Sequence, residues 1–384
     1  MTTNVQRRKA DFQSEAISGK RWLLTKFLFT ILITLIFCIS LVYVFISNWI
    51  TPASIPEVPF ANIPSVKNER PVSSQYEIKP KEESAFLVPE GDMEDTLIGG
   101  GLHAPEGFTT DDRKEQFYTF LIVGLDEGFN TDTIIVASYD GLKQKANLIS
   151  IPRDTLVNVK RPLKKINAAY PVGARNGDKS EGMAQLQREI KTIIGFVPDF
   201  FLLVNFSAFT ELVDAIGGVD VEADINMVYD DPVQNLHINI PKGQQHLDGI
   251  NALRFARYRK GGSGYRTLSD YERIENQQKV IKAVLTQLLK PENILKVPEF
   301  IEIFNNNVFS NLDSGNILWF AGEINKIKGT DALSAFTIPT AGTSGEPSYY
   351  EYLDKDGVIR LVNETINPYI KDIEAKDVDI INYE

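Results

Sequence analysis

Arginines are concentrated between Asn251 and Arg273 of a chain that is otherwise acidic. Six basic side chains stand there against Asp270 and Glu272, a net charge of +4, whereas the chain of 384 residues has a formal net charge of -11. The six are Arg254, Arg257, Arg259, Lys260, Arg266 and Arg273. Guanidinium groups are fixed forks of N–H donors that suit phosphate or carboxylate oxygens. The cluster indicates an anionic ligand, and a solvated basic face is the alternative.

Within this cluster, Arg257 and Arg259 are two positions apart. In an extended segment both side chains would leave the same face and could hold one diphosphate together. The run from Ser269 to Glu272 then has the form of a capping box, which predicts the start of a helix. Asp270, Arg273 and Gln277 would form a polar stripe on it. An aspartate at a helix N-terminus with a salt bridge three residues on is the purely structural alternative.

Two further aspartates lie at expected strand ends. Asp132 stands immediately before an apolar strand, and Asp154 follows Arg153 in a Pro-bounded turn after another strand. Ligands of open α/β sheets collect at strand ends. Two carboxylates there could share one Mg²⁺, which proteins usually bind through one or two carboxylates plus substrate phosphates. Each aspartate by itself is also a common turn former.

Apolar runs and helical spacing alternate along the chain from residue 117. Strands are expected at 117–123, 133–139, 146–151 and 200–206, and a helix at 179–194 that ends at Gly195. Ser207 is the expected N-cap of a second helix that ends at Gly217. The alternation predicts an α/β fold, a layered α-β-α domain with helices on both faces of a mixed central sheet.

The N-terminal region predicts a membrane anchor. Residues 27–50 form an uncharged apolar run of 24 residues, long enough to span a bilayer core of about 30 Å. A signal peptide is the alternative, but its apolar region is usually shorter. The basic residues in 1–26 place the N-terminus in the cytoplasm. Residues 51–115, rich in Pro and carboxylates, would be an extracellular linker, and residues 116–384 an extracellular folded domain.

Composition excludes several classes of function. Cys38 is the only cysteine and lies in the apolar run, so neither an intramolecular disulfide nor a cysteine metal site can form. The three histidines are scattered and no HExxH occurs, which argues against a zinc centre. A pI near 5.0 argues against nonspecific nucleic-acid binding. The sequence also lacks a GxxxxGK[ST] phosphate loop, which argues against nucleotide hydrolysis.

Several phrases in a fixed order resemble the LytR-CpsA-Psr family. They are TDTIIV from Thr131, LISIPRDT from Leu148, KINAAY from Lys165, VNFSAFTELVDAIGGVDV from Val204, LDGINALRFARYR from Leu247, DYERIENQQ from Asp270 and the tail EPSYYEYLDKDGV. The resemblance covers about residues 117–369. A single N-terminal membrane helix with its N-terminus in the cytoplasm also matches the usual layout of that family.

The resemblance implies a phosphotransferase of the cell membrane. It would move an anionic glycopolymer, such as a teichoic acid or a capsular polysaccharide, from a polyprenyl pyrophosphate carrier onto peptidoglycan or a related wall polymer by forming a phosphodiester. Mg²⁺, or Mn²⁺, would be its cofactor, and no nucleic acid would be a partner. An apolar tunnel between the sheet and the helix from Ser269 would hold the polyprenyl chain.

The same resemblance implies roles for particular residues. Asp132 and Asp154 would be the metal-linked carboxylates, with Arg153 and Asp270 beside them at the reacting groups. The pyrophosphate would be held by Arg153 together with Arg175, Arg257, Arg259, Arg273 and Gln277. Asp270 would orient the arginines or act near the acceptor hydroxyl.

Two positions depart from the family pattern. Asn130 and Asn276 stand where the family often has Arg, and both changes remove positive charge, which predicts altered donor recognition. Two other functions stay open: a polyprenyl pyrophosphate phosphatase that uses water as acceptor, and a noncatalytic membrane anchor that binds wall polymer or lipid. Covalent attachment of polymer to peptidoglycan, as opposed to release of free phosphate, would distinguish the transferase from the phosphatase.

Overall fold

The computed structural model of the chain describes residue 53 and residues 104–383, except 127–129, 233–235, 289, 295, 325, 327–331 and 346–348. The chain divides into two compact units, residues 1–53 and 54–384, and every described helix and strand belongs to the second. The predicted basic tail (1–26), membrane helix (27–50) and most of the linker lie outside the described residues. None of the described helices is both long and apolar enough to cross a membrane.

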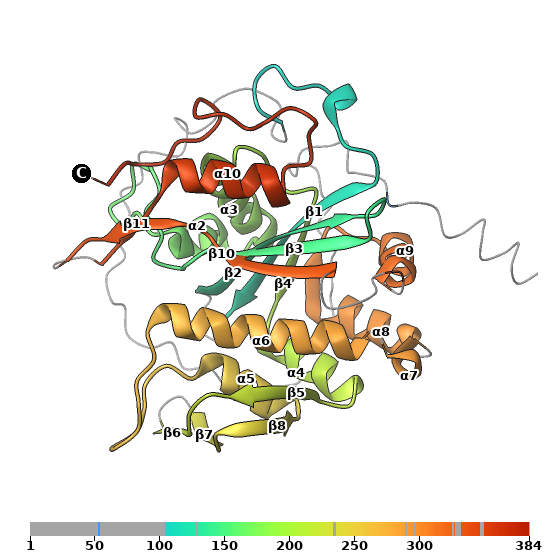
Figure 1. The fold of residues 1–384 in the computed structure, drawn as a ribbon, viewed down its shortest axis with the longest axis vertical. Helices are drawn as coiled ribbons and strands as arrows, with labels where there is room; N and C mark the ends of the chain where they lie inside the picture. Colours follow the sequence, from blue (N-terminus) through green and yellow to red (C-terminus); the bar gives the residue numbers. More distant parts are fainter. Residues whose placement is uncertain are drawn as a thin grey trace, which may run out of the picture. The chain divides into compact units, whose positions relative to one another are not determined.

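Six strands form a mixed sheet in the order β10-β3-β2-β1-β4-β9 (Figure 1). They are β1 (Phe117–Leu125), β2 (Thr131–Asp140), β3 (Lys145–Ser150), β4 (Phe200–Val204), β9 (Val308–Ser310) and β10 (Leu333–Thr337). β2 is antiparallel to both β1 and β3, and β9 is antiparallel to β4, whereas β4 is parallel to β1 and β10 is parallel to β3. The predicted mixed central sheet is confirmed.

The continuous apolar run of β1 is explained by its position inside the sheet. Leu121 and Val123 are fully buried in the cluster on one face. Phe120 and Ile122, which point the other way, pack against the cluster on the opposite face. A strand covered on both faces needs apolar side chains at every position, so it loses the alternation typical of a half-exposed strand.

One face of the sheet is covered by α3 (Lys179–Ile194) and α10 (Lys355–Thr365), with the short α2 (Ala169–Gly173) alongside (Figure 1). The bounds of α3 are those that the sequence predicted. Met183, Leu186 and Ile190 on its inner side are completely buried. Gly195 ends the helix in the left-handed region at φ 88°, where an L side chain would be strained.

The other face is covered by α6 (Asp270–Leu288), which has apolar contacts on two sides. Ile281 and Leu285 pack toward the central sheet. Val280 and Val284 are buried in a further cluster shared with α4 (Phe206–Ala215) and α5 (Gly249–Arg257). Figure 1 shows α6 lying between the sheet and this outer layer. The predicted arrangement of helices on both faces is confirmed.

Short elements complete the domain. Four strands of the outer layer pair as two antiparallel ribbons, β5 with β8 and β6 with β7. They are β5 (Val219–Ala223), β6 (Met227–Asp231), β7 (Leu236–Ile240) and β8 (Gly243–Leu247). The remaining elements are β11 (Thr340–Thr343), β12 (Glu351–Leu353), α7 (Pro291–Ile294), α8 (Val297–Asn307), α9 (Ser314–Ile324) and the 3₁₀ turns η3 (Thr110–Asp112), η4 (Ile166–Ala168) and η5 (Ala174–Asn176).

Three details differ from the sequence predictions. Asn205, not Ser207, caps α4, because its side chain accepts a hydrogen bond from the Ala208 N–H at 2.8 Å. Asp132 lies inside β2, whose pairing extends to Thr131. Residues 104–115, assigned to the linker, pack on the folded unit: the Lys114 N–H donates to the Pro368 carbonyl at 2.8 Å.

Candidate functional site

Strand pairing brings Asp132 and Arg153 together. β2 and β3 are antiparallel, with Ile135 opposite Ser150. Asp132 is three residues before Ile135 and Arg153 is three residues after Ser150, so both lie at the same end of this strand pair. β1 terminates at this end, and β4, which is parallel to β1, ends there too. The neighbouring strand ends that the sequence indicated therefore do meet.

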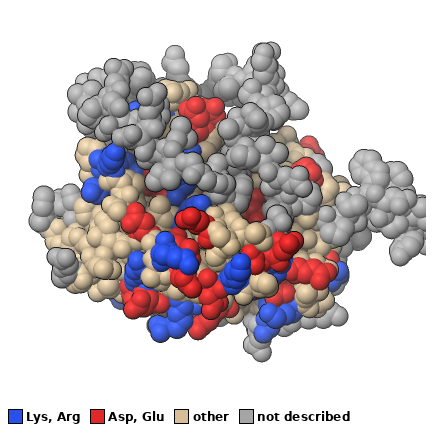
Figure 2. Space-filling view, turned by 90° about the horizontal axis from the view of Figure 1, so that it is seen from above, with Lys and Arg blue, Asp and Glu red and all other residues tan. Residues whose placement is uncertain are grey.

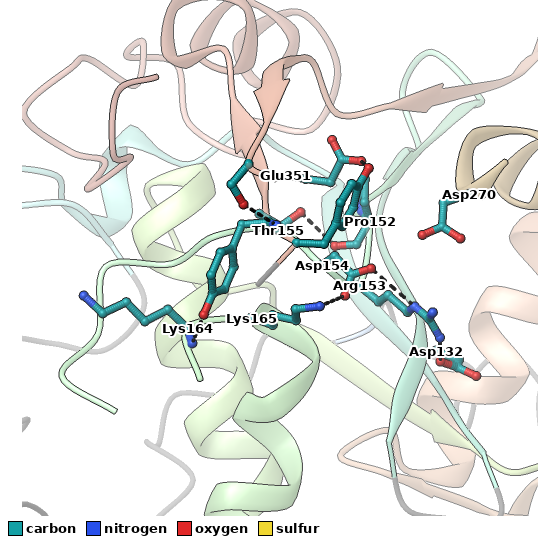
Figure 3. Close-up of polar contacts among 12 residues, drawn as sticks. Asp132, Pro152, Arg153, Asp154, Thr155, Lys164, Lys165, Asp270 and Glu351 are labelled. Atoms are coloured by element: carbon teal, nitrogen blue, oxygen red, sulfur yellow. Dashed lines mark hydrogen bonds and ion pairs between the residues drawn. The ribbon is translucent and has the colours of Figure 1, made fainter. Parts of the chain in front are cut away.

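Arg153 lies between two aspartates (Figure 3). Its Nη1 donates to Asp132 Oδ1 at 3.0 Å, and its Nε is 3.7 Å from Asp154 Oδ2. Burial lowers the pKa of Arg153, but the hydrogen bond and charge of Asp132, with the charge of Asp154, outweigh burial and raise it. The guanidinium stays fully protonated and holds both carboxylates close to one another.

Lys165 is a further member of this group. Its Nζ contacts Asp154 Oδ1 at 2.7 Å, and Asp154 is buried. Lys165 also lies 5.9 Å from the ring centre of Tyr350. The sequence placed Lys165 at the start of the KINAAY phrase but gave it no role. The fold supplies one, because a buried carboxylate needs a charged or hydrogen-bonding partner.

The first turns of α6 contribute the other side of the site. The capping box is present as predicted: the Ser269 N–H donates to Glu272 Oε2 at 2.8 Å, and the Glu272 N–H donates to Ser269 Oγ at 3.3 Å. This cap fixes the start of the helix. Asp270, Arg273 and Gln277 then line one pocket together, as the predicted polar stripe required.

The pocket lies between the start of β2, the turn after β3 and α6. Its polar walls are Asp132, Ser150, Arg153, Asp270, Arg273 and Gln277, and its apolar walls include Ile134, Ile135 and Ile274. Ile135 also belongs to the apolar cluster between the sheet and α6. A charged pocket thus opens next to the apolar layer beneath α6.

Arg273 carries the least compensated charge in this pocket. Its side chain is 8% exposed, and its Nη2 is 3.6 Å from Asp270 Oδ1. Burial, and next the positive charge of Arg153, lowers the pKa of Arg273. Among the described residues, Arg273 Nε, Arg153 Nε and Asp270 Oδ1 are all buried without a hydrogen-bond partner. Unsatisfied polar atoms of this kind are costly unless a ligand or water completes them.

Arg257 and Arg259 do not share one extended segment, so that prediction was wrong. Arg257 is the last residue of α5, where its guanidinium stacks 4.5 Å from the ring centre of Phe206. Arg259 lies beyond the helix, and its Nε is 3.5 Å from Asp270 Oδ1. The helix continues further than the spacing suggested, since Ala252 and Phe255 are buried in the cluster beneath it. Of these two arginines, Arg259 is the one with a contact to a described residue that lines the pocket.

Arg175 is not among the residues that line the pocket. It is exposed on η5, between α2 and α3. Of the two positions that depart from the family pattern, Asn130 is exposed and donates to Asp126 Oδ2 at 3.1 Å. Asn276 is buried on α6. A longer charged side chain at 276 would need a partner inside the protein.

The residues present fit a divalent cation that also binds substrate. Asp132 and Asp154 both approach Arg153, and the Asp132 side chain is 36% exposed. No group of three or more His, Cys, Asp or Glu side chains arranged for a metal occurs in the described part of the chain. Two carboxylates are the usual protein contribution to a Mg²⁺ site whose other ligands are water and phosphate.

On the face shown in Figure 2, the described acidic and basic side chains are interspersed and form no broad basic surface. The layered fold and the pocket together place the chain among α-β-α proteins with an arginine- and carboxylate-lined pocket at one edge of a mixed sheet. The chain belongs to the LytR_cpsA_psr family, whose model matches residues 95–365. The resemblance drawn from the sequence phrases is thereby confirmed.

Similar proteins include two groups of named relatives. The regulatory protein MsrR of Staphylococcus aureus is 25% identical over 268 residues, 67% of this chain and 75% of MsrR. A protein of Oceanobacillus iheyensis named polyisoprenyl-teichoic acid–peptidoglycan teichoic acid transferase TagU is 28% identical over 269 residues, 68% of this chain and 78% of TagU.

Solved structures share the fold. The crystal structure of Bacillus subtilis TagV superimposes with a TM-score of 0.54 at 23% identity, covering 65% of this chain and 96% of TagV. A structure of TagT bound to LIIa-WTA gives a TM-score of 0.51 at 20% identity, covering 65% of this chain and 89% of TagT. At these identities the structures confirm the architecture of the domain.

Proposed function

We propose that this protein transfers an anionic glycopolymer from a polyprenyl pyrophosphate carrier to peptidoglycan or a related wall polymer. Its family and the transferase named TagU support glycopolymer transfer to the wall. The observation that carries the phosphate chemistry is that two arginines lining one pocket, Arg153 and Arg273, each have a buried Nε without a hydrogen-bond partner. Two guanidinium groups with spare donors suit the oxygens of a pyrophosphate.

The reaction asks mainly for positioning and charge stabilisation. An acceptor hydroxyl oxygen would form a bond to the phosphorus that carries the glycopolymer. The bond from that phosphorus to the bridging oxygen would break, and polyprenyl monophosphate would leave. Arg153 and Arg273 would stabilise charge on the phosphate oxygens. Asp270, whose Oδ1 is buried without a hydrogen bond, would accept the proton from the hydroxyl.

Asp132 and Asp154 would hold a Mg²⁺. When bound, the ion would neutralise negative charge on the pyrophosphate oxygens. In the structure each of these carboxylates is paired with a cation, Arg153 or Lys165. These ion pairs hold the two carboxylates beside Arg153, where a metal ion could replace a side-chain partner.

The apolar layer beneath α6 would receive the polyprenyl chain. Phe120, Ile122, Ile281, Leu285 and Leu333 lie between the sheet and α6 yet stay partly exposed. Ile135 joins this layer to the pocket, because it lines both. A lipid whose pyrophosphate sits at Arg153 could therefore lay its apolar chain along α6.

The decisive experiment is transfer by the full-length protein in detergent, with a polyprenyl pyrophosphate-linked glycopolymer as donor and peptidoglycan as acceptor. We expect a phosphodiester between polymer and peptidoglycan, detected by mass spectrometry after digestion of the wall polymer, together with release of polyprenyl monophosphate. If polyprenyl monophosphate and free polymer ending in a phosphomonoester were released while no polymer became attached to peptidoglycan, water would be the acceptor and the protein would be a phosphatase. If the donor remained intact, it would be a binding protein.

A matching topology follows from the uncharged run at 27–50 and the basic residues before it. We propose that residues 1–26 are cytoplasmic and that the folded domain lies outside the cell membrane, tethered by the part of residues 51–115 that precedes residue 104. Protease added to intact cells with an accessible outer surface should remove the folded domain, whereas an N-terminal tag should be protected. The reverse pattern of protection would contradict this orientation.

A further inference from the structure

Two tyrosines beside the pocket present their rings to solvent while their hydroxyls point inward. Tyr271 is 41% exposed and Tyr349 is 44% exposed. The Tyr349 hydroxyl donates to Glu351 Oε1 at 2.7 Å, and the Tyr271 hydroxyl lies 3.4 Å from Glu351 Oε2. Glu351 itself is 2% exposed. Both hydroxyls thus lie near one buried carboxylate, and the Tyr271 hydroxyl also contacts Thr340 Oγ1.

This tyrosine pair is connected, through Glu351, to the turn that carries Arg153 and Asp154. The Glu351 N–H donates to the Asp154 carbonyl at 3.0 Å, and the Leu156 N–H donates to the Glu351 carbonyl at 2.9 Å. Tyr271 directly follows Asp270 at the start of α6. Figure 3 shows Glu351 beside the turn that carries Arg153 and Asp154. The two tyrosines are therefore connected to the segments that carry Asp154 and Asp270.

The chemistry of the pair favours a neutral ligand with an apolar face. Burial, and next the hydrogen bond to Glu351, raises the pKa of Tyr349, so its hydroxyl stays protonated and occupied as a donor. The buried Glu351 carboxylate lies where an anion would be repelled. What remains available is the flat ring surface, which packs well against C–H groups because Tyr is apolar over most of its area.

We propose that Tyr271 and Tyr349 form a carbohydrate subsite that stacks a pyranose ring next to the phosphate being transferred. The inference rests on the proposed function, because it names where a sugar of that reaction binds. The ring could belong to the acceptor glycan or to the first sugar of the donor. Both present the same C–H face, so substrate-specific measurements must tell them apart.

The test compares Ala and Phe at each tyrosine in the full-length protein. At each position both replacements remove the hydroxyl that contacts Glu351, but only Ala removes the ring. We expect Tyr271→Ala and Tyr349→Ala to raise the KM of one substrate about tenfold with a smaller change in kcat, whereas the Phe variants stay near wild type. Tyr265→Ala is the matched control, because Tyr265 is 44% exposed and lies in the glycine-rich loop.

Separate KM measurements for the acceptor and for the donor identify which sugar binds at the two tyrosines. A KM increase for acceptor alone assigns the ring to the acceptor glycan, and an increase for donor alone assigns it to the donor. If both KM values were unchanged in the Tyr271→Ala/Tyr349→Ala double variant, the subsite would be refuted.

Calorimetric binding of a peptidoglycan glycan fragment and of a donor-sugar fragment separates this inference from the proposed function, since it requires no turnover. If the wild-type protein made no phosphodiester, the proposed transferase function would be wrong. If the wild type nevertheless bound a sugar fragment and the Ala variants did not, the carbohydrate subsite would still be supported.

Discussion

Asp132→Ala is expected to lower the transfer rate by about 10²- to 10³-fold, the usual cost of removing one group that stabilises charge in a transition state. Stability should change little, because the Asp132 side chain is 36% exposed and its ion pair with Arg153 is partly screened. Asp154 is buried, so Asp154→Asn, which keeps the shape, is the informative variant there. Initial rates of polymer attachment across a Mg²⁺ titration should reveal the loss in both variants.

Asp140→Ala supplies the control for these variants. Asp140 is an ion-paired aspartate on the same strand, and it lies at the other end of β2, opposite Lys145. Its replacement should leave the transfer rate and the Mg²⁺ dependence unchanged. If Asp132→Ala transferred polymer as fast as Asp140→Ala, the paired-carboxylate site would have to be abandoned.

Arg273→Met is expected to change donor binding and stability in different directions. Loss of a charge-assisted hydrogen bond costs about 1.5–3 kcal/mol, so affinity for a short-chain prenyl pyrophosphate should fall by about one to two decades. Stability should stay equal or rise, because the buried Arg273 Nε has no hydrogen-bond partner and an apolar side chain of similar length removes that cost. Titration calorimetry and thermal unfolding measure the two effects.

Arg266→Met controls for the loss of a nearby charge. Arg266 is exposed and pairs with Glu272, outside the pocket lining. The Arg266→Met substitution should leave donor affinity unchanged. Arg259 lies next to Asp270, and Arg259→Lys should weaken donor affinity because Lys keeps the charge but not the planar fork. Equal affinities in Arg273→Met and Arg266→Met would mean that the arginines are only a charged surface.

The sequence predicted the central fold where patterns were local and strong. α3 has helical periodicity and a glycine stop, and its bounds agree with the structure. The outer-layer strands were not predicted. β5, β7 and β8 have five residues each and partly exposed alternating patterns, and their pairing depends on contact with α4, α5 and α6. The order of the central sheet likewise depends on long-range pairing that no single segment encodes.

The candidate site, too, could be predicted only where local spacing fixes the arrangement of its side chains. Asp270, Arg273 and Gln277 share a face because helical spacing fixes their directions. Arg257 could not be placed from spacing, since the end of α5 depends on packing in the outer layer. Lys165 and Glu351 both join the site by contacting Asp154. Along the chain they lie 11 and 197 positions after it. Such partners become visible only after the chain has folded.

The capping box at the start of α6 makes the site insensitive to the length of the segment before it. Ser269 and Glu272 bond to each other, so the helix begins at a position set by its own sequence. The angular phase of Asp270, Arg273 and Gln277 is therefore independent of how many residues separate them from Arg259. A change in loop length near Gly262 or Gly264 would therefore not rotate these three side chains away from the pocket.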